Sequence, residues 1–286
     1  MRFLVGELQL GNKNDTHPSN TGIPPMKLAN LQKEIVARMH SRFTPVYLIN
    51  EYPKSGGTWL KMMLAEALGH PAWTKGKPVW APCVMQAHWI APRGRCRIVG
   101  LFRDGRDVMV SYYYHSLFRN ELGNEPLVKL MRQRTNFKDR GDIQSNLLPF
   151  MKILFDDPVS PNFSWLDFVS RWATRSGVVV CRYEDLRAQT ARTLSNVHHA
   201  LVGTHLEPKL AQQIADSYSM QNMRKRKAEL NPGLKGQSNA EISFIRKGSV
   251  GGWSECFTDE ALAWFEGRAG FALDVLGYSR GRPRGT

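Results

Sequence analysis

The chain has 286 residues, of which 42% are hydrophobic and 22% are charged, a composition typical of a globular protein with one large α/β domain. Lys and Arg outnumber Asp and Glu by 39 to 25, and the resulting charge of +14 favours anionic partners, among them nucleotides, nucleic acid, sulfated substrates and acidic membranes. No apolar run has the length of a transmembrane segment, and four widely spaced cysteines argue against a metal site or a disulfide framework. We therefore expect a reduced, cytoplasmic protein.

Residues 1–28, rich in Asn, Gly, Pro and Ser, are predicted to form a flexible leader, and residues 29–286 a single domain. Buried-type strands are expected at residues 45–51, 97–102 and 177–182. Helical patterns are expected at residues 29–39, 58–68, 107–118, 126–133, 145–155, 165–173, 187–202 and 258–276. This alternation predicts an α/β fold, a mainly parallel central sheet flanked by helices, with ligands at the carboxyl ends of the strands. Residues 69–82, with their Gly and Pro, are expected to form an irregular loop.

Residues 52–59 (YPKSGGTW) are the most informative stretch, because they lie between a predicted strand and a predicted helix. Such a turn points backbone N–H groups and a helix N-terminus at a phosphate. Gly56 and Gly57 lack a Cβ and let an anion approach the main chain, while Lys54 adds a charge and Thr58 a hydroxyl. Lys54 precedes both glycines, so this P-loop-like segment differs from the G-x-x-x-x-G-K-[ST] loop of nucleoside triphosphatases.

Two further segments suit phosphate. In residues 103–113 (RDGRDVMVSYY), Arg103 offers a planar fork and Ser111 a hydroxyl, although Arg103 could instead pair with Asp104 or Asp107. In residues 244–253 (FIRKGSVGGW), two adjacent cations before a Gly-rich turn could close over a phosphate or simply form a basic surface loop.

Together, in this order and at these separations, the three segments resemble the cytosolic-type, nucleotide-dependent sulfotransferases. In that family they read Y-P-K-S-G-T-T-W, R-x-x-x-D-V-x-V-S-Y-Y and R-K-G-x-x-G-D-W. The resemblance extends from about residue 45 to residue 278 and includes Trp165, Trp172 and the run Tyr183-Glu184-Asp185. It implies an enzyme that moves the sulfuryl group of 3′-phosphoadenosine 5′-phosphosulfate (PAPS) to a hydroxyl acceptor, with PAPS as co-substrate and no metal.

The resemblance also implies the residues that bind the donor. For the 5′ side they are Lys54, Ser55, Gly56, Gly57, Thr58 and Trp59, with Trp59 against the adenine. For the 3′-phosphate they are Arg103 and Ser111, and for the adenosine Tyr183, Ser219 and Met220. Closing over the nucleotide are Arg246, Lys247 and Gly248.

The predicted catalytic residues are His88, Lys54 and Ser111. His88 lies nine residues before the strand at 97–102, about where the family reads K-T-H-x-P, and imidazole suits a general base near neutral pH. The implied mechanism is in-line transfer, in which His88 takes the acceptor proton while Lys54 and loop N–H groups stabilise the leaving phosphate. His115 is a second histidine that could line the acceptor side.

The chain departs from the family pattern at several positions. Gln86 stands at the family's Lys, Gly57 at a Thr and Gly252 at the Asp before Trp253. The family dimer motif falls on Ser254, Thr258, Asp259 and Ala263, of which only Thr258 matches, so no oligomeric state is predicted.

Two other classes of protein remain as alternatives. A nucleotide-dependent kinase would share the sheet and a phosphate loop, but the chain lacks a Gly-Lys-Ser/Thr triplet. A basic nucleic-acid-binding protein would suit the charge, but no recognised reading module is present, so nucleic acid is not an expected partner. The acceptor is expected to be a hydroxyl-bearing small molecule, lipid or glycan. This rests on aromatic residues that suit an apolar alcohol or a sugar ring, namely Trp73, Trp80, Trp89, Tyr113, Tyr114 and Phe118.

Overall fold

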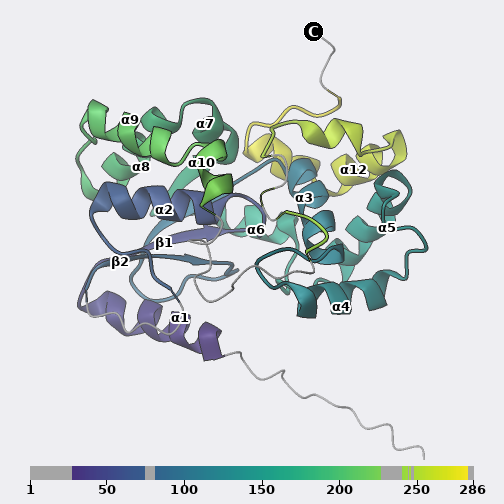
Figure 1. Ribbon diagram of the computed structural model, residues 1–286, viewed down its shortest axis with the longest axis horizontal. Coiled ribbons are helices and arrows are strands. Elements are labelled where there is room, and N and C mark those ends of the chain that lie inside the picture. The colour runs from purple at the N-terminus through teal and green to yellow at the C-terminus, as the bar shows by residue number, and fades with distance from the viewer. Residues whose placement is uncertain (1–27, 75–80, 227–239, 244, 246–247, 283–286) are drawn as a thin grey trace, which may run out of the picture.

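A four-stranded sheet lies at the centre of the protein, whose computed structural model describes residues 28–74, 81–226, 240–243, 245 and 248–282 (Figure 1). The strands pair in the order β2-β1-β3-β4, and all three pairings are parallel. Their bounds are β1 Val46–Glu51, β2 Cys83–Ala87, β3 Arg97–Phe102 and β4 Val178–Arg182. The predicted mainly parallel sheet is therefore confirmed.

Helices cover both faces of the sheet (Figure 1). One face packs against α2 Gly57–Leu68, α7 Tyr183–Ala188, α8 Thr190–Val202, α9 Pro208–Ser217 and α10 Met220–Lys225. The other packs against α1 Leu28–Arg38, α3 Gly105–Leu117, α4 Glu125–Thr135, α5 Ile143–Asp156, α6 Trp165–Trp172 and α12 Asp259–Val275. Short 3₁₀ turns are present at η1 His40–Arg42 and η2 Gly252–Glu255.

The central strand β1 is buried on both faces, which is why it reads as an almost unbroken apolar run. Successive side chains of a strand point to opposite faces, so Tyr47 and Ile49 enter the core on the α2 side, while Val46 and Leu48 enter the opposite core. By the same alternation Glu51, the last residue of β1, falls on the α2 side. The strand therefore ends with a buried carboxyl group beneath the start of α2.

The chain reverses its direction of winding at β1, and this locates the ligand crevice. The helix after β1 packs on one face, whereas the helices between β3 and β4 pack on the other. In an open α/β sheet such a switch leaves a crevice beyond the carboxyl ends of the adjoining strands. Lys54 follows β1 and Arg103 follows β3, so both lie at this edge, as predicted.

Several elements differ from the sequence-based prediction. Strand β2 was not predicted. It follows directly after the predicted loop at residues 69–82, and it was missed because it is a five-residue edge strand next to a Gly- and Pro-rich segment. The single helix expected at 187–202 is two helices, α7 and α8, which meet at Gln189. Helices α9 and α10 were not predicted. The last helix begins as expected, with the Thr258 hydroxyl accepting from the N–H of Ala261, and Gly277 follows it at φ +73°.

The described residues contain four free cysteines, and none of their helices is long and apolar enough to cross a bilayer. Of the predicted leader only Leu28 is described, as the first residue of α1.

A buried arginine ties the start of α3 to the C-terminal part of the chain. The Nη2 of Arg106 lies 2.7 Å from Oδ2 of Asp104, and its Nη1 lies 3.1 Å from Oε1 of Glu266 on α12. Its guanidinium carbon stacks 4.1 Å from the ring centroid of Trp253 in η2. Arg106 thus fixes the helix that carries Ser111 against the segment that carries Gly248.

We expect Arg106→Ala to destabilise the protein by about 3–5 kcal/mol, because it leaves the buried carboxylate of Asp104 without its partner. The matched control is Arg268→Ala, which removes a solvent-exposed pair with Asp156 and should cost less than about 1 kcal/mol. Urea unfolding of both variants measures the difference. Equal losses would contradict a buried anchor at Arg106.

Candidate active site

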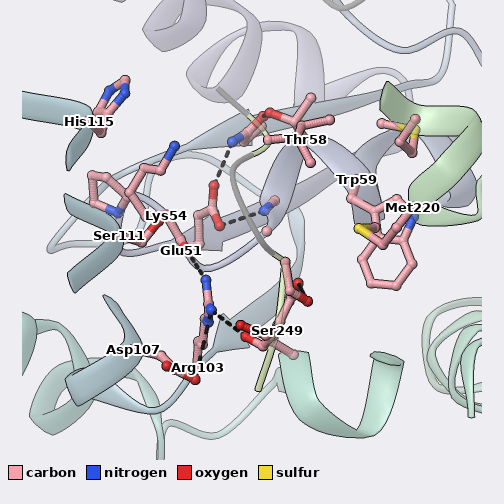
Figure 2. Close-up of a pocket in the computed structure, with 18 of the residues that line it drawn as sticks. Glu51, Lys54, Thr58, Trp59, Arg103, Asp107, Ser111, His115, Met220 and Ser249 are labelled. Atoms are coloured by element: carbon pink, nitrogen blue, oxygen red, sulfur yellow. Dashed lines mark hydrogen bonds and ion pairs between the residues drawn. The ribbon is translucent and has the colours of Figure 1, made fainter. Parts of the chain in front are cut away.

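One pocket opens at the carboxyl edge of the sheet, and most predicted site residues line it (Figure 2). They follow the ends of all four strands or come from the helices and turn beside them. The predicted residues that line the pocket are Lys54, Gly56, Gly57, Thr58, Trp59, His88, Arg103, Ser111, His115, Tyr183, Met220 and Gly248.

The loop after β1 has an unusual backbone. Lys54 has φ +76°, and Gly56, which precedes α2, has φ +103°. A Cβ on Gly56 would lie 2.7 Å from the ring of Tyr183, so only glycine fits between the loop and that ring. Non-glycine residues rarely adopt the left-handed region, and when they do the surroundings hold them there. At Lys54 the carbonyl is held by Nη1 of Arg103 at 3.1 Å.

The N–H of Gly57, predicted to face an anion, instead donates to Oε2 of Glu51 at 2.6 Å. The other oxygen, Oε1, accepts from Nε2 of Gln86, also at 2.6 Å. A Cβ on Gly57 would lie only 2.3 Å from Oε1 of Glu51, which explains why glycine stands where the family has Thr. Burial raises the pKa of Glu51 to about 7, against the opposing effects of these hydrogen bonds and of Lys54.

Arg103 is held mainly by backbone carbonyls. Its Nη2 donates to the carbonyl of Ser249 at 3.0 Å and lies 3.8 Å from Oδ2 of Asp107, and its Cζ lies 4.5 Å from the centroid of Tyr183. Its buried Nε has no hydrogen-bond partner among the described residues. The alternative pairing with Asp107 is therefore present but long, whereas Asp104 pairs with Arg106. Arg103 is both an anchor of the site and a cation on its wall.

His88 follows β2 at the edge of the pocket. Its Nδ1 lies 3.0 Å from the backbone carbonyl of Glu51. Because a carbonyl can only accept, Nδ1 carries the proton and Nε2 keeps its lone pair as an acceptor. Burial, with a smaller effect of Lys33, lowers the pKa of His88 to about 4, so the imidazole is neutral near pH 7.

His115 on α3 has the opposite tautomer. The side-chain amide nitrogen of Asn120 lies 3.1 Å from its Nδ1. An amide nitrogen only donates, so Nδ1 accepts and Nε2 carries the proton. Burial, with Lys54 and His88, lowers the pKa of His115 to about 3. The pocket thus holds two neutral histidines, one with a free acceptor nitrogen and one with a ring N–H.

A sequence profile described as "Sulfotransferase domain" matches residues 91–268, more than half of the chain. The chain belongs to this family. The matched residues include Arg103, Ser111 and Gly248 and begin after the loop that carries Lys54.

Among individual proteins, the chain is similar to rat sulfotransferase 2B1, with 24% identity in an alignment of length 247 that covers 72% of the chain. The match spans just under two thirds, 64%, of that relative's length. It is also similar to guinea-pig 3-beta-hydroxysteroid sulfotransferase, with 23% identity over 72% of the chain and 76% of the relative. Bovine sulfotransferase 1E1 is 24% identical over 83% of the chain and 86% of the relative.

Two solved structures show that the fold is shared. Mouse sulfotransferase SULT7A1, complexed with PAP, superposes with a TM-score of 0.57 at 20% identity over 80% of this chain and 84% of that one. Retinol dehydratase, in a complex with retinol and PAP, superposes with a TM-score of 0.61 at 15% identity over 88% of this chain and 87% of that one. The predicted P-loop-like sulfotransferase fold is therefore confirmed.

Four predicted residues of this sulfotransferase domain are not placed on the pocket wall. The hydroxyl of Ser55 is buried and donates to the carbonyl of Tyr52 at 2.8 Å. The Ser219 hydroxyl caps α10 by accepting from the N–H of Asn222. Arg246 and Lys247 lie outside the described residues. Ser55 and Ser219 thus shape the backbone of the site through their side chains.

The aromatic residues expected at the acceptor differ in where they lie. Trp73 and Tyr113 are buried in the core, and the ring of Tyr113 packs 5.1 Å from that of Phe150, so these two do not face an acceptor. Tyr114 lines a small pocket that adjoins the main one at Lys54, Ser111 and His115. Trp89 and Phe118 are partly buried against the core, and Trp80 lies outside the described residues.

Two carboxylates were missed by sequence analysis as parts of the site. Glu51 is the only charged residue in the strand Val46–Glu51, and a charge at the end of a buried strand was the available signal. Asp107 was considered only as a partner of Arg103. Its two oxygens accept from the N–H groups of Gly251 (2.8 Å) and Trp253 (3.0 Å). Asp107 therefore holds the end of the third motif, residues 244–253, against α3.

The low pKa of His88 predicts that the protein loses stability in mild acid. The pKa of His88 is lower in the folded protein than its ordinary value of 6.5, so the unfolded chain takes up more protons below that value. Stability present above pH 6.5 is therefore lost as the pH falls towards 4, by on the order of 2–3 kcal/mol for this residue. We expect His88→Asn to remove that part of the pH dependence in urea unfolding at pH 7 and pH 4.5.

Glu51 acts with the opposite sign, because its raised pKa gives stability that is lost as the pH rises through about 7. The difference between wild type and His88→Asn cancels this contribution. Identical pH profiles for the two proteins would contradict a buried neutral His88.

Proposed function

We propose that this protein is a PAPS-dependent sulfotransferase that transfers the sulfuryl group to a hydroxyl acceptor by in-line displacement, with His88 as general base. The observation that carries the proposal is the convergence of Lys54, His88 and Arg103, from the ends of three strands, on one pocket. Membership of the sulfotransferase family and the PAP complexes of proteins with the same fold support the choice of donor.

The pocket residues fit a nucleotide with phosphates at both ends. Gly56 without a Cβ, Thr58 and the Lys54 ammonium would hold the 5′ side, where negative charge also meets the N-terminus of α2. Arg103, which lines the pocket, and Ser111 would hold the 3′-phosphate. The adenosine would lie against aromatic and thioether side chains, those of Trp59, Tyr183 and Met220.

When bound, PAPS supplies an activated sulfuryl group with a phosphate as its leaving group. His88 accepts the acceptor proton at Nε2, and its Nδ1–H bond to the carbonyl of Glu51 fixes this tautomer. The pKa of His88 is low in the free protein, and negative charge brought into the pocket raises it, so the base strengthens when it is needed. Lys54 stabilises negative charge that grows on the leaving phosphate.

The acceptor side is proposed to take a small apolar alcohol. The relatives include a protein named 3-beta-hydroxysteroid sulfotransferase, and a protein of the same fold has been solved with retinol and PAP. Tyr114 beside Ser111 and His115 offers this chain an aromatic face at that side of the site. A lipid or glycan hydroxyl remains within the proposed acceptor class, and the site of action is proposed to be the cytoplasm, the compartment that the family resemblance implies.

The donor is tested by binding. Adenosine 3′,5′-bisphosphate (PAP) at about 100 times its Kd should stabilise the protein by roughly 2.7 kcal/mol, observed as a raised Tm. Arg103→Ala should weaken PAP roughly 10- to 100-fold more than it weakens AMP, which lacks the 3′-phosphate, a difference of about 1.5–3 kcal/mol.

Arg268→Ala is the matched control, since it removes a surface arginine remote from the pocket lining. If ATP stabilised the protein and PAP did not, a kinase would replace the sulfotransferase. Equal losses for PAP and AMP in Arg103→Ala would make Arg103 purely structural.

The base is tested by turnover. His88→Asn should leave the Kd of PAP nearly unchanged and lower kcat by a factor on the order of 10²–10⁴. A nitrophenol acceptor, already ionised at neutral pH, should recover part of the loss because it needs no base. A folded variant with normal turnover would remove His88 from the mechanism, and His115→Asn would then be measured.

A further inference from the structure

The carboxyl group of Glu51 contacts the loop that is proposed to bind the phosphate of the donor. Figure 2 shows Glu51 between Lys54 and Thr58, facing the pocket from the end of β1. We propose that Glu51 is a proton-linked competitor for the anionic donor, so that PAPS and PAP bind the form in which Glu51 carries a proton and each binding event above neutral pH takes up one proton. This inference rests on the proposed function.

The competition begins at a backbone N–H. Gly57 is the first residue of α2, and its N–H has no partner within the helix. Such N–H groups are the ones that hold a phosphate at a helix N-terminus. In this protein the Gly57 N–H points to Oε2 of Glu51 at 2.6 Å. An ionised Glu51 therefore takes the place of a bound anion at the N-terminus of α2.

The residues around Glu51 hydrogen-bond its carboxyl group and leave space for it. Gln86 donates its amide to Oε1, and Thr58 holds Gln86 by donating to its amide oxygen at 3.2 Å. Gly57 leaves the space that the carboxyl group fills. Gln86 and Gly57 are the two positions at which this loop region departs from the family pattern, and both contact Glu51. One residue thus accounts for both departures.

The charges around Glu51 determine whether it takes up a proton when an anion binds. The cations that act on Glu51 are Lys54 in the loop, Lys33 on α1 and Lys61 on α2, while His88, whose Nδ1 binds the backbone carbonyl of Glu51, is neutral. Two anions held close together in a buried site repel each other, and this repulsion is relieved when one is protonated. Burial already raises the pKa of Glu51 to about 7, so protonation requires little free energy near neutral pH.

The proton balance is simple. Above neutral pH, the ionised carboxylate, one proton from solvent and the ligand combine to give the bound ligand beside a neutral carboxyl group. The neutral group accepts from the Gly57 N–H more weakly than the carboxylate does, so the ligand can compete for that N–H, and the carboxyl O–H becomes a donor. The contribution of Glu51 to ligand affinity should therefore be nearly flat below pH 7 and fall about tenfold per pH unit well above it.

The experiment is isothermal titration of PAP into the full chain between pH 6 and pH 9, with HEPES and Tris compared at pH 8. We expect the Kd of wild type to rise about 50-fold from pH 7 to pH 9, and the heat to differ between buffers as expected for uptake of about one proton. Glu51→Gln, an uncharged isostere, should bind at pH 9 about as tightly as wild type binds at pH 7, without proton uptake.

Two comparisons isolate Glu51. Glu66→Gln, an exposed carboxylate on the same helix α2, should keep the wild-type pH dependence. Titration of the ligand phosphates, whose pKa is about 6, occurs in all variants and cancels in the comparison with Glu51→Gln. Burial lowers the pKa of Lys61 and the Glu51 carboxylate raises it, so Lys61 loses its charge more readily in Glu51→Gln. That effect would weaken anion binding by the variant at high pH, which is opposite to the expected result.

The outcomes separate this inference from the function on which it rests. PAP binding that is independent of pH above 7, without proton uptake, would overturn the role of Glu51 and leave the sulfotransferase proposal standing. A folded Glu51→Gln protein, verified by its Tm, that binds PAP more weakly than wild type at every pH would also overturn it. If Glu51→Gln does not fold, the proton uptake of wild type tests the proposal, because binding of PAP without proton uptake at pH 8 would overturn it. No PAP binding at any pH would overturn both proposals.

Discussion

Parallel pairing of β1 with β2 on one side and β3 on the other is the constraint on which the site depends. Parallel strands end at the same edge of a sheet, so the register that aligns Asn50 with Ala87 and with Gly100 also brings together the residues that follow each strand. His88, Lys54 and Arg103 come from three separate parts of the sequence and meet there. Without that ladder, these three residues would not line one pocket.

The pocket keeps its positive charge because its main cation is held by neutral groups. Arg103 donates to the carbonyls of Lys54 and Ser249, and its distance to Asp107 is long, so its charge is only partly compensated. Glu51 works in the opposite direction, since it puts a titratable negative charge near Lys54. In the proposed function, anion binding is thus a balance between fixed positive and adjustable negative charge.

The turn after Gly248 is held to the sheet through α3. Asp107 binds the backbone of Gly251 and Trp253, and Arg106 stacks on the ring of Trp253 while it pairs with Asp104 and Glu266. Adjacent residues of one helix therefore position the third motif and the C-terminal helix. The same helix presents Ser111 and His115 to the pocket, so structural and proposed binding roles are carried by one rigid element.

The sequence by itself determined the features that depend on near neighbours. The apolar run before residue 52, the glycines after it, the Thr258 cap and the strand that ends at Phe102 follow from local spacing and turn chemistry, and they were predicted correctly. The three motifs were also sufficient to indicate the family and most of the residues that line the pocket.

Only the tertiary structure decided what those local features contact. Strand β2 owes its existence to pairing with β1, since five residues at a sheet edge carry little pattern of their own. The hydroxyls of Ser55 and Ser219 bind nearby backbone groups, which no family motif specifies. Glu51 meets Gln86, 35 residues away, and Asp107 meets Gly251, 144 residues away. Such contacts depend on where the fold places distant segments, so the charge and protonation state of the site could be known only after the chain was folded.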